Sequence, residues 1–156
     1  MRYAVEHQAE HAQRGATFQR ALAEGIRREV PDAIINGASI ADRGVSSERL
    51  PGNVHVSIPG AEGDALLMLL DAAGVDCSTG SACTAGIPEP SHVLLAMGVD
   101  ERTARSSLRF SFGRTSTMDD VDAVISALPS VVERARRAGS VSASTHTSVG
   151  AGRADR

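Results

Sequence analysis

The sequence predicts an α+β fold, with a small and mostly antiparallel sheet that packs helices on one face. Helix-like and strand-like stretches follow one another as α-β-β-α-β-loop-α-β-α, without the regular βαβ alternation of a parallel sheet. The chain has 156 residues, which suits one modest domain. Hydrophobic residues make up 42% of it and aromatic residues only 3%, so we expect a core of mainly aliphatic side chains.

The N-terminal stretch predicts a helix over residues 4–29, which Pro31 ends. Its apolar stripe has a spacing of four residues and consists of Phe18, Leu22 and Ile26. The next stretch, AIING at 33–37, predicts a short buried strand that closes in an Asn-Gly turn. A polar connection then leads to Pro51 and Gly52.

A second strand is expected over 53–58, where apolar and polar residues alternate. In this pattern His55 faces away from the valines and is expected to face solvent. Residues 62–73 predict a helix that is apolar nearly all round between 66 and 70, which is typical of a deeply buried helix. An extended piece begins at 75–77 and leads into a loop of small residues.

The C-terminal half predicts a capped helix from Ser91 to Gly98 and a strand over 107–113. Thr117 and Asp120 form a capping box for a last helix, which we expect to kink at Pro129 and to end near Arg137. From Gly139 the residues are small, polar and aperiodic. We therefore expect one domain over 1–138 and a disordered tail over 139–156.

Composition argues against several classes of function. A net charge of −3 gives no basic surface for nucleic acid, so no nucleic-acid partner is expected. No apolar run approaches the roughly 20 residues of a membrane span, and the N-terminal residues lack the apolar region of a secretory signal. The expected location is the cytoplasm, where the two cysteines would be free. All 16 basic residues are arginines, so no side chain of this sequence offers a primary amine.

The stretch STGSACTAG, residues 78–86, places Cys83 among residues too small to build a core. The thiol can be a small buried hydrophobe or a functional nucleophile, and the residues alone leave both readings open. Cys77 ends an extended piece beside Val75, which indicates a structural role. The cysteines lie six residues apart without a CxxC motif or clustered histidines, so no metal site is expected.

Arg109 interrupts an apolar strand on its polar face. It is either a solvated edge-strand arginine or a guanidinium aimed at a carboxylate, which its two parallel donors suit. His92 follows the expected cap and is typical of a surface histidine, and Arg114 is typical of a surface charge.

Three stretches carry a resemblance to a known family. STGSACTAGIPEPSHVLLAMG and SSLRFSFGRTSTMDDVD, with LPGNVHVSIPGAEGDALLMLL upstream, resemble the C-terminal part of pyridoxal-phosphate-dependent cysteine desulfurases. The likeness covers residues 10–137. It implies the small C-terminal domain of the aspartate-aminotransferase-like fold, without the upstream cofactor domain.

The resemblance also implies roles for two residues. Cys83 matches the cysteine that takes sulfur from substrate L-cysteine as a persulfide, leaves L-alanine and passes the sulfur to an acceptor or scaffold protein for iron–sulfur or other sulfur-cofactor assembly. Transient iron–sulfur ligation through Cys83 is compatible with this role. Arg109 matches the ligand of the substrate carboxylate. A mobile loop of small residues suits a thiol that must reach both cofactor and acceptor.

The family's cofactor-holding lysine has no counterpart in this sequence. We therefore expect pyridoxal phosphate in the complete enzyme but none on this chain alone, which should be inactive without a cofactor domain or a homodimer partner. One alternative is a non-catalytic domain that accepts persulfide or docks scaffold proteins. Another is a regulatory α+β binding module whose likeness to the family is incidental.

Overall fold

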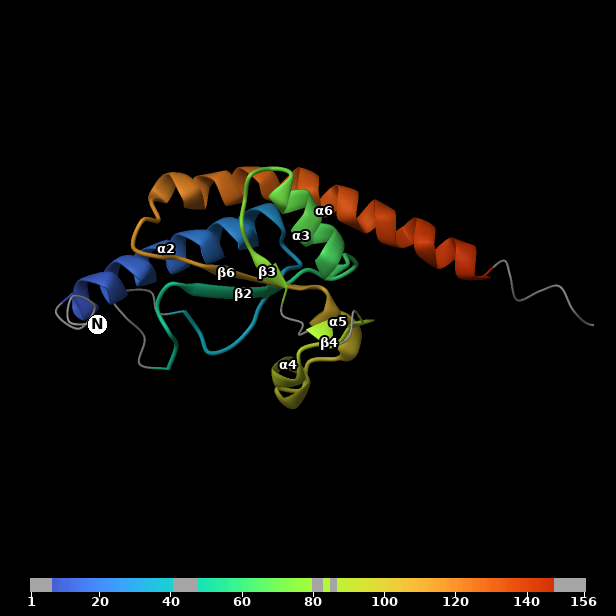
Figure 1. Ribbon diagram of the computed structural model, residues 1–156, viewed down its shortest axis with the longest axis horizontal. Coiled ribbons are helices and arrows are strands. Elements are labelled where there is room, and N and C mark those ends of the chain that lie inside the picture. The colour runs from blue at the N-terminus through green and yellow to red at the C-terminus, as the bar shows by residue number, and fades with distance from the viewer. Residues whose placement is uncertain (1–6, 41–47, 80–82, 85–86, 148–156) are drawn as a thin grey trace, which may run out of the picture.

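The computed structural model describes residues 7–40, 48–79, 83–84 and 87–147. In this part of the chain, five helices accompany a four-stranded sheet and a two-stranded hairpin (Figure 1). The helices are α2 (Gln8–Glu29), α3 (Gly63–Asp71), α4 (His92–Ala96), α5 (Glu101–Arg105) and α6 (Met118–Thr147). The strands are β1 (Ile34–Ile35), β2 (Asn53–Ser57), β3 (Ser78–Thr79), β4 (Cys83–Thr84), β5 (Ile87–Pro88) and β6 (Ser107–Ser111).

The larger sheet has the strand order β1-β2-β6-β3, and all of its neighbouring strands are antiparallel. Its centre is the pair β2 and β6, in which His55 lies opposite Arg109 and Val56 lies opposite Leu108. On the other side of β6, Ser78 of β3 lies opposite Arg109. The antiparallel sheet confirms the predicted fold class.

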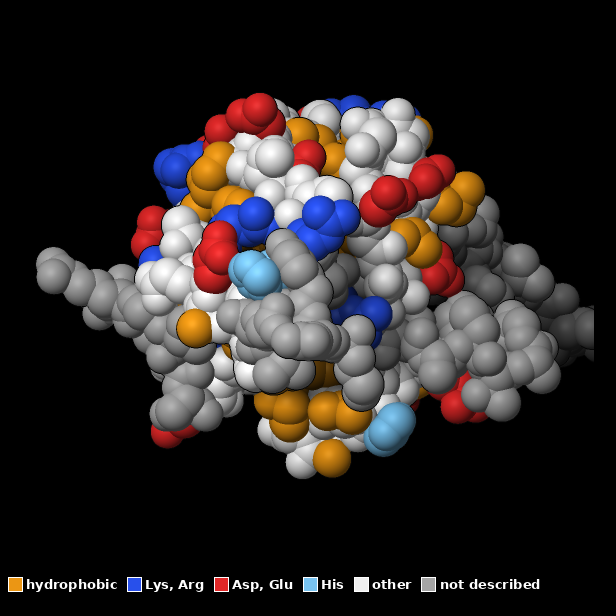
Figure 2. Space-filling model, turned by 60° about the vertical axis from the view of Figure 1, so that its left-hand side comes forward, with side chains coloured by type: hydrophobic (Ala, Val, Ile, Leu, Met, Phe, Trp, Pro, Cys, Tyr) orange, Lys and Arg blue, Asp and Glu red, His pale blue; other side chains and the backbone are white. Residues whose placement is uncertain are grey.

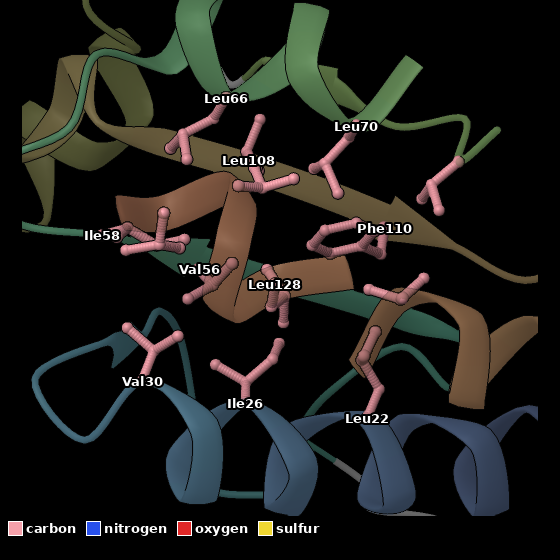
Figure 3. Close-up of a cluster of buried hydrophobic side chains, with 14 of the residues drawn as sticks. Leu22, Ile26, Val30, Val56, Ile58, Leu66, Leu70, Leu108, Phe110 and Leu128 are labelled. Carbon is pink, nitrogen blue, oxygen red and sulfur yellow. The ribbon is translucent and has the colours of Figure 1, made fainter. Parts of the chain in front are cut away.

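One face of this sheet is covered by α2, α3 and α6 (Figure 1). Alternate residues of the two central strands point into this layer, because successive side chains of a strand face opposite sides. Figure 3 shows them between leucine and isoleucine side chains from the three helices. The fully buried members of the core include Leu22, Ile26, Val54, Val56, Ile58, Leu66, Leu70, Leu108, Val121 and Leu128.

Two predictions about burial were wrong. The helix α3 buries Leu66 and Leu70, but Met68 on its outer side is 72% exposed, so the helix covers the sheet with one face and is not enclosed. The expected buried strand at 33–37 is the edge strand β1, in which Ile34 is 46% exposed. In both cases some of the apolar residues lie on a side of the element that no neighbouring element in the described part of the chain covers.

The last helix, α6, begins as predicted, with Asp120 accepting a hydrogen bond from the backbone N–H of Thr117 at 2.8 Å. It contains Pro129 and runs on to Thr147. The helix therefore passes Gly139, where the sequence led us to expect a disordered tail, because its packed first half supplies the nucleus that isolated helices lack. Residues 148–156 lie outside the described part, and the division into a domain and a tail stays a prediction.

The opposite side of the sheet carries α4, α5 and the hairpin of β4 and β5 (Figure 1). The helix α5 was not predicted from the sequence, although Asp100 caps it by accepting a hydrogen bond from the N–H of Thr103 at 3.0 Å. Among the helices that the structure describes, none combines the length and the apolar character needed to cross a membrane.

Candidate functional site

A cleft of about 980 Å³ lies over the face of the sheet that the long helices leave open. Its floor is formed by residues of β2, β3 and β6, and its walls by α4 and by residues 36–38 and 48–50. Figure 2 shows one side of the molecule, where arginine and histidine side chains gather near the centre. Hydrophobic side chains gather along its lower edge, at the height of α4 in Figure 1. Val93 and Leu95 of α4 are exposed, and so is Met97 directly after the helix.

Arg109 lies on the floor of this cleft and is exposed. The strand alternation places it there because its neighbours Leu108 and Phe110 point into the core. None of the ion pairs found in the described part of the chain involves Arg109. Its guanidinium therefore faces the cleft, and no carboxylate of the described residues forms an ion pair with it.

His55 lies beside Arg109 in the register of the sheet and is half-buried. This corrects the expectation of a solvent-facing side chain, because Asn36 from the neighbouring segment covers one edge of the ring. The amide nitrogen of Asn36 lies 3.0 Å from Nδ1 of His55 and donates to Oγ of Ser57 at 2.9 Å. Burial lowers the pKa of His55 from its ordinary value of 6.5, and the positive charges of Arg109 and Arg49 lower it further.

Arg49 is a second guanidinium on the wall of the cleft. Its Nη1 donates to the backbone carbonyl of Ala38, while its Nε is buried without a hydrogen-bond partner among the described residues. Burial, followed by the charge of Arg27, lowers the pKa of Arg49 from its ordinary value, yet an arginine remains a cation near neutral pH. Two fixed cations therefore border the same cleft.

Cys83 opens the hairpin, in which β4 pairs with β5. The backbone of Cys83 is described, whereas its side chain lies outside the described part. The chain lines the cleft at Thr79 before the hairpin and again at Glu89 after it. The chain on either side of the hairpin that carries Cys83 therefore lines the cleft.

Cys77 also lines the cleft, but its side chain is half-buried and packs against the core. Burial raises the pKa of its thiol to about 11, with smaller contributions from the charges of Asp76 and Asp71. A thiol in this environment is protonated at neutral pH and is a poor nucleophile. This agrees with the structural role predicted for Cys77.

His92 and Arg114 are exposed, as predicted, and His92 also lines the cleft. Sequence reasoning missed Asn36 and Arg49 as members of the site. The sequence places Asn36 only in a turn. Counting the alternation of the strand on to Asn36 would have placed it beside His55. The structure shows no group of three or more His, Cys, Asp or Glu that could hold a metal ion within the part of the chain it describes.

Comparison with known proteins places this arrangement in a family. The family model for class-V aminotransferases matches residues 20–124, which include the sheet and the strand of Arg109. This chain belongs to the class-V aminotransferase family. Members of this family are pyridoxal-phosphate enzymes, so the cofactor is implied for the full-length relatives.

Cysteine desulfurases are among the proteins of curated function that are similar to this chain. An IscS-like cysteine desulfurase of Mycobacterium tuberculosis is 53% identical over 135 residues, which cover 86% of this chain and 33% of that protein. A cysteine desulfurase IscS of Clostridium botulinum is 38% identical, covering 85% of this chain and 32% of the relative. The chain therefore spans about a third of the length of these relatives.

Solved structures give the same result. A NifS-like protein from Rickettsia africae superposes with a TM-score of 0.65 at 27% identity, covering 82% of this chain and 31% of the other. DesI, solved with its TDP-sugar product, superposes with a TM-score of 0.60 at 19% identity, which supports the fold alone. Its coverage is 88% of this chain and 35% of the other.

Proposed function

We propose that this chain is the nucleophile-bearing part of a cysteine desulfurase. In this proposal Cys83 takes the sulfur of L-cysteine as a persulfide, leaves L-alanine and passes the sulfur to an acceptor or scaffold protein. The relatives support the reaction class, because a protein that is 53% identical to the chain over 135 residues is an IscS-like cysteine desulfurase. Assembly of iron–sulfur or other sulfur cofactors in the cytoplasm is the proposed destination of the sulfur.

The observation that carries the proposal is the short length of chain between Cys83 and Ser78, the residue that pairs with Arg109 in the sheet. Ser78 lies opposite Arg109 in the sheet, and Cys83 follows five positions after Ser78. An extended chain of this length reaches at most about 17 Å, so the thiol stays within reach of the cleft above Arg109. Thr79 before the hairpin and Glu89 after it line that cleft, which supports a nucleophile that acts on a ligand bound there.

Arg109 is proposed to hold the α-carboxylate of the substrate. Its guanidinium is exposed on the cleft floor, and a guanidinium binds a carboxylate through two parallel N–H···O hydrogen bonds. A lysine at this position would keep the charge but lose this geometry. Arg109 therefore orients the substrate, while Cys83 accepts its sulfur.

The residues of this chain do not fit a cofactor held through a lysine, because all 16 basic residues are arginines. The residues that hold pyridoxal phosphate must therefore belong to another domain, either in the same polypeptide or in a partner protein. In the proposal, this chain contributes to the joint active site the arginine that binds the substrate carboxylate and the cysteine that acts as nucleophile.

The proposed sulfur transfer is balanced without a further oxidant. The C–S bond of L-cysteine breaks and an S–S bond forms at Cys83, so the two sulfurs together give up two electrons. The β-carbon takes up this electron pair and a proton and becomes the methyl group of L-alanine. The persulfide then passes its outer sulfur to a thiol of the acceptor protein.

The experiment is a chimera in which this chain replaces the corresponding third of the Mycobacterium tuberculosis relative. With L-cysteine it should release L-alanine and, with a reductant, sulfide. The variant Cys83→Ser should release neither product, and Cys77→Ser is its matched control with unchanged turnover. Arg109→Ala should raise the KM for cysteine at least thirtyfold, the equivalent of about 2 kcal/mol, and Arg109→Lys should not restore it.

Full turnover by Cys83→Ser would refute the nucleophile, and unchanged cysteine kinetics in Arg109→Ala would return that residue to a solvated strand position. Circular dichroism of each variant shows that the fold is retained, so that lost activity is not lost structure.

A second candidate is a non-catalytic domain that accepts persulfide from another protein. The absence of lysine favours it, because the chain offers no side-chain amine for the cofactor. In that case the chimera would be inactive, while the chain alone would take up sulfur from a persulfidated donor protein.

A further inference from the structure

The hydrogen bonds of His55 determine which of its ring nitrogens faces the cleft as a donor. The side-chain amide of Asn36 is buried, at 7% exposure, and its nitrogen contacts both Oγ of Ser57 and Nδ1 of His55. An amide nitrogen carries two hydrogens and no acceptor, so each contact uses one hydrogen. Nδ1 of His55 is then the acceptor, and in a neutral imidazole the proton is on Nε2.

The surrounding charges favour this neutral form. The ionisable groups that line the cleft around His55 are Glu48, Arg49, Cys77, Glu89, His92 and Arg109. Of these, Arg109 and Arg49 are the ones whose charges lower the pKa of His55, and both disfavour a third cation. His55 therefore remains neutral near pH 7 and keeps its N–H on Nε2.

The register of the sheet places this donor next to the exposed guanidinium. His55 and Arg109 are cross-strand neighbours on the same face, a relation that brings Cβ atoms to about 4.5–5.5 Å. Both line the cleft. The guanidinium has only donors, and the neutral ring adds one more donor on the side away from Asn36.

We propose that His55 is a substrate-binding residue whose Nε2–H, fixed by Asn36, completes with Arg109 a carboxylate site made only of donors. This inference rests on the proposed function and adds the group that the site selects. A carboxylate presents only acceptors and satisfies every donor, whereas a carboxamide turns its NH₂ group toward at least one N–H. The site therefore selects free α-amino acids over their amides.

The test uses the full chain labelled with ¹⁵N and follows the histidine ring nitrogens by NMR at pH 7. The probes are L-alanine, which keeps the α-carboxylate, and L-alaninamide, which lacks it. We expect His55 to be neutral with its proton on Nε2, and L-alanine but not L-alaninamide to shift that resonance. Arg109→Ala should abolish the shift, and Cys83→Ser should leave it intact.

Two variants at the pair of residues sharpen the test. Asn36→Asp replaces the donor at Nδ1 by an acceptor, so the proton of His55 should move to Nδ1 or the ring should become a cation. His55→Phe keeps a ring but removes its donor and should weaken L-alanine binding about tenfold, as read at the guanidinium resonance of Arg109. His92→Gln is the control, because that histidine lines the cleft outside the pair and should bind L-alanine as the unmodified chain does.

A proton on Nδ1 in the unmodified chain, or equal responses to L-alanine and L-alaninamide, would overturn the inference. So would unchanged L-alanine binding in His55→Phe. If Cys83→Ser left the turnover of the chimera unchanged while L-alanine still shifted the His55 resonance, the proposed function would be refuted but the carboxylate site would be supported.

Discussion

The two faces of the four-stranded sheet differ completely, although consecutive residues of the same strands build them. On one face Val56 and Leu108 are fully buried against α2, α3 and α6. On the other face the neighbouring residues His55 and Arg109 line a cleft. The comparison teaches that a strand can stabilise the fold with every second residue and leave the residues between them free for binding.

Substitutions on the two faces should therefore separate stability from binding. Leu108→Ala should lower the free energy of unfolding by about 2–5 kcal/mol, because it leaves a cavity in the core. Arg109→Ala, at the next residue, should change it by no more than about 0.5 kcal/mol, because the side chain is exposed. Urea unfolding followed by circular dichroism measures both. Equal losses for the two variants would show that the cleft face also supports the fold.

The two cysteines extend the comparison to reactivity. Burial raises the pKa of Cys77 from 9.0 to about 11, which lowers its thiolate fraction near pH 8 by about a hundredfold. Limited alkylation and peptide mapping should label Cys83 first. Labelling of Cys77 should increase about tenfold for each pH unit up to its pKa. Preferential labelling of Cys77 at pH 8 would contradict this assignment of the two thiols.

The helix α3, on the packed face of the sheet, comes so close to another backbone segment at Gly63 that a larger residue would not fit there. A Cβ atom at Gly63 would lie 2.6 Å from the backbone carbonyl oxygen of Arg105, which cannot move as a side chain does. Gly63→Ala should therefore destabilise the chain by about 1–3 kcal/mol in thermal or urea unfolding. Gly113→Ala is the matched control, since nothing lies within 4 Å of that Cβ position. A loss of stability in the control as large as that in Gly63→Ala would remove the steric explanation.

Exposed ion pairs should contribute least. Asp32 accepts a hydrogen bond of 2.6 Å from Arg136, which lowers the pKa of the carboxyl group, but its side chain is 55% exposed. A lowered pKa adds stability above the ordinary value of 3.8, and this stability is lost as the pH falls below it. Asp32→Asn should cost at most about 1 kcal/mol at pH 7, and this cost should decrease as the pH falls below 3.8. A larger cost that persists at pH 2 would mean that another contact of Asp32 matters.

The sequence predicted the fold well because its signals are periodic. The alternation at 53–58 and 107–113 located both central strands, and Phe18, Leu22 and Ile26 located the face of α2 that is buried. The motif around Cys83 and Arg109 identified the family that the comparisons confirm. The roles of these two residues stay predictions.

What the sequence could not give depends on contacts between distant segments. Alternation shows that His55 and Val56 face opposite sides, but it does not show that Asn36 covers His55. The apolar run at 66–70 likewise predicted a deeply buried helix, although neighbouring elements cover only the face of α3 with Leu66 and Leu70. The short helix α5 was missed because it has too few residues for a helical period to appear.

The central claim is that Cys83 accepts the sulfur. The most direct measurement is intact-peptide mass spectrometry of the chimera after one turnover with L-cysteine and rapid acid quenching. The account predicts one additional sulfur atom on the peptide of Cys83 and none on that of Cys77. In Arg109→Ala the same product should form only at raised cysteine concentration. Additional sulfur on Cys77, or L-alanine released while Cys83 stays unmodified, would contradict the account.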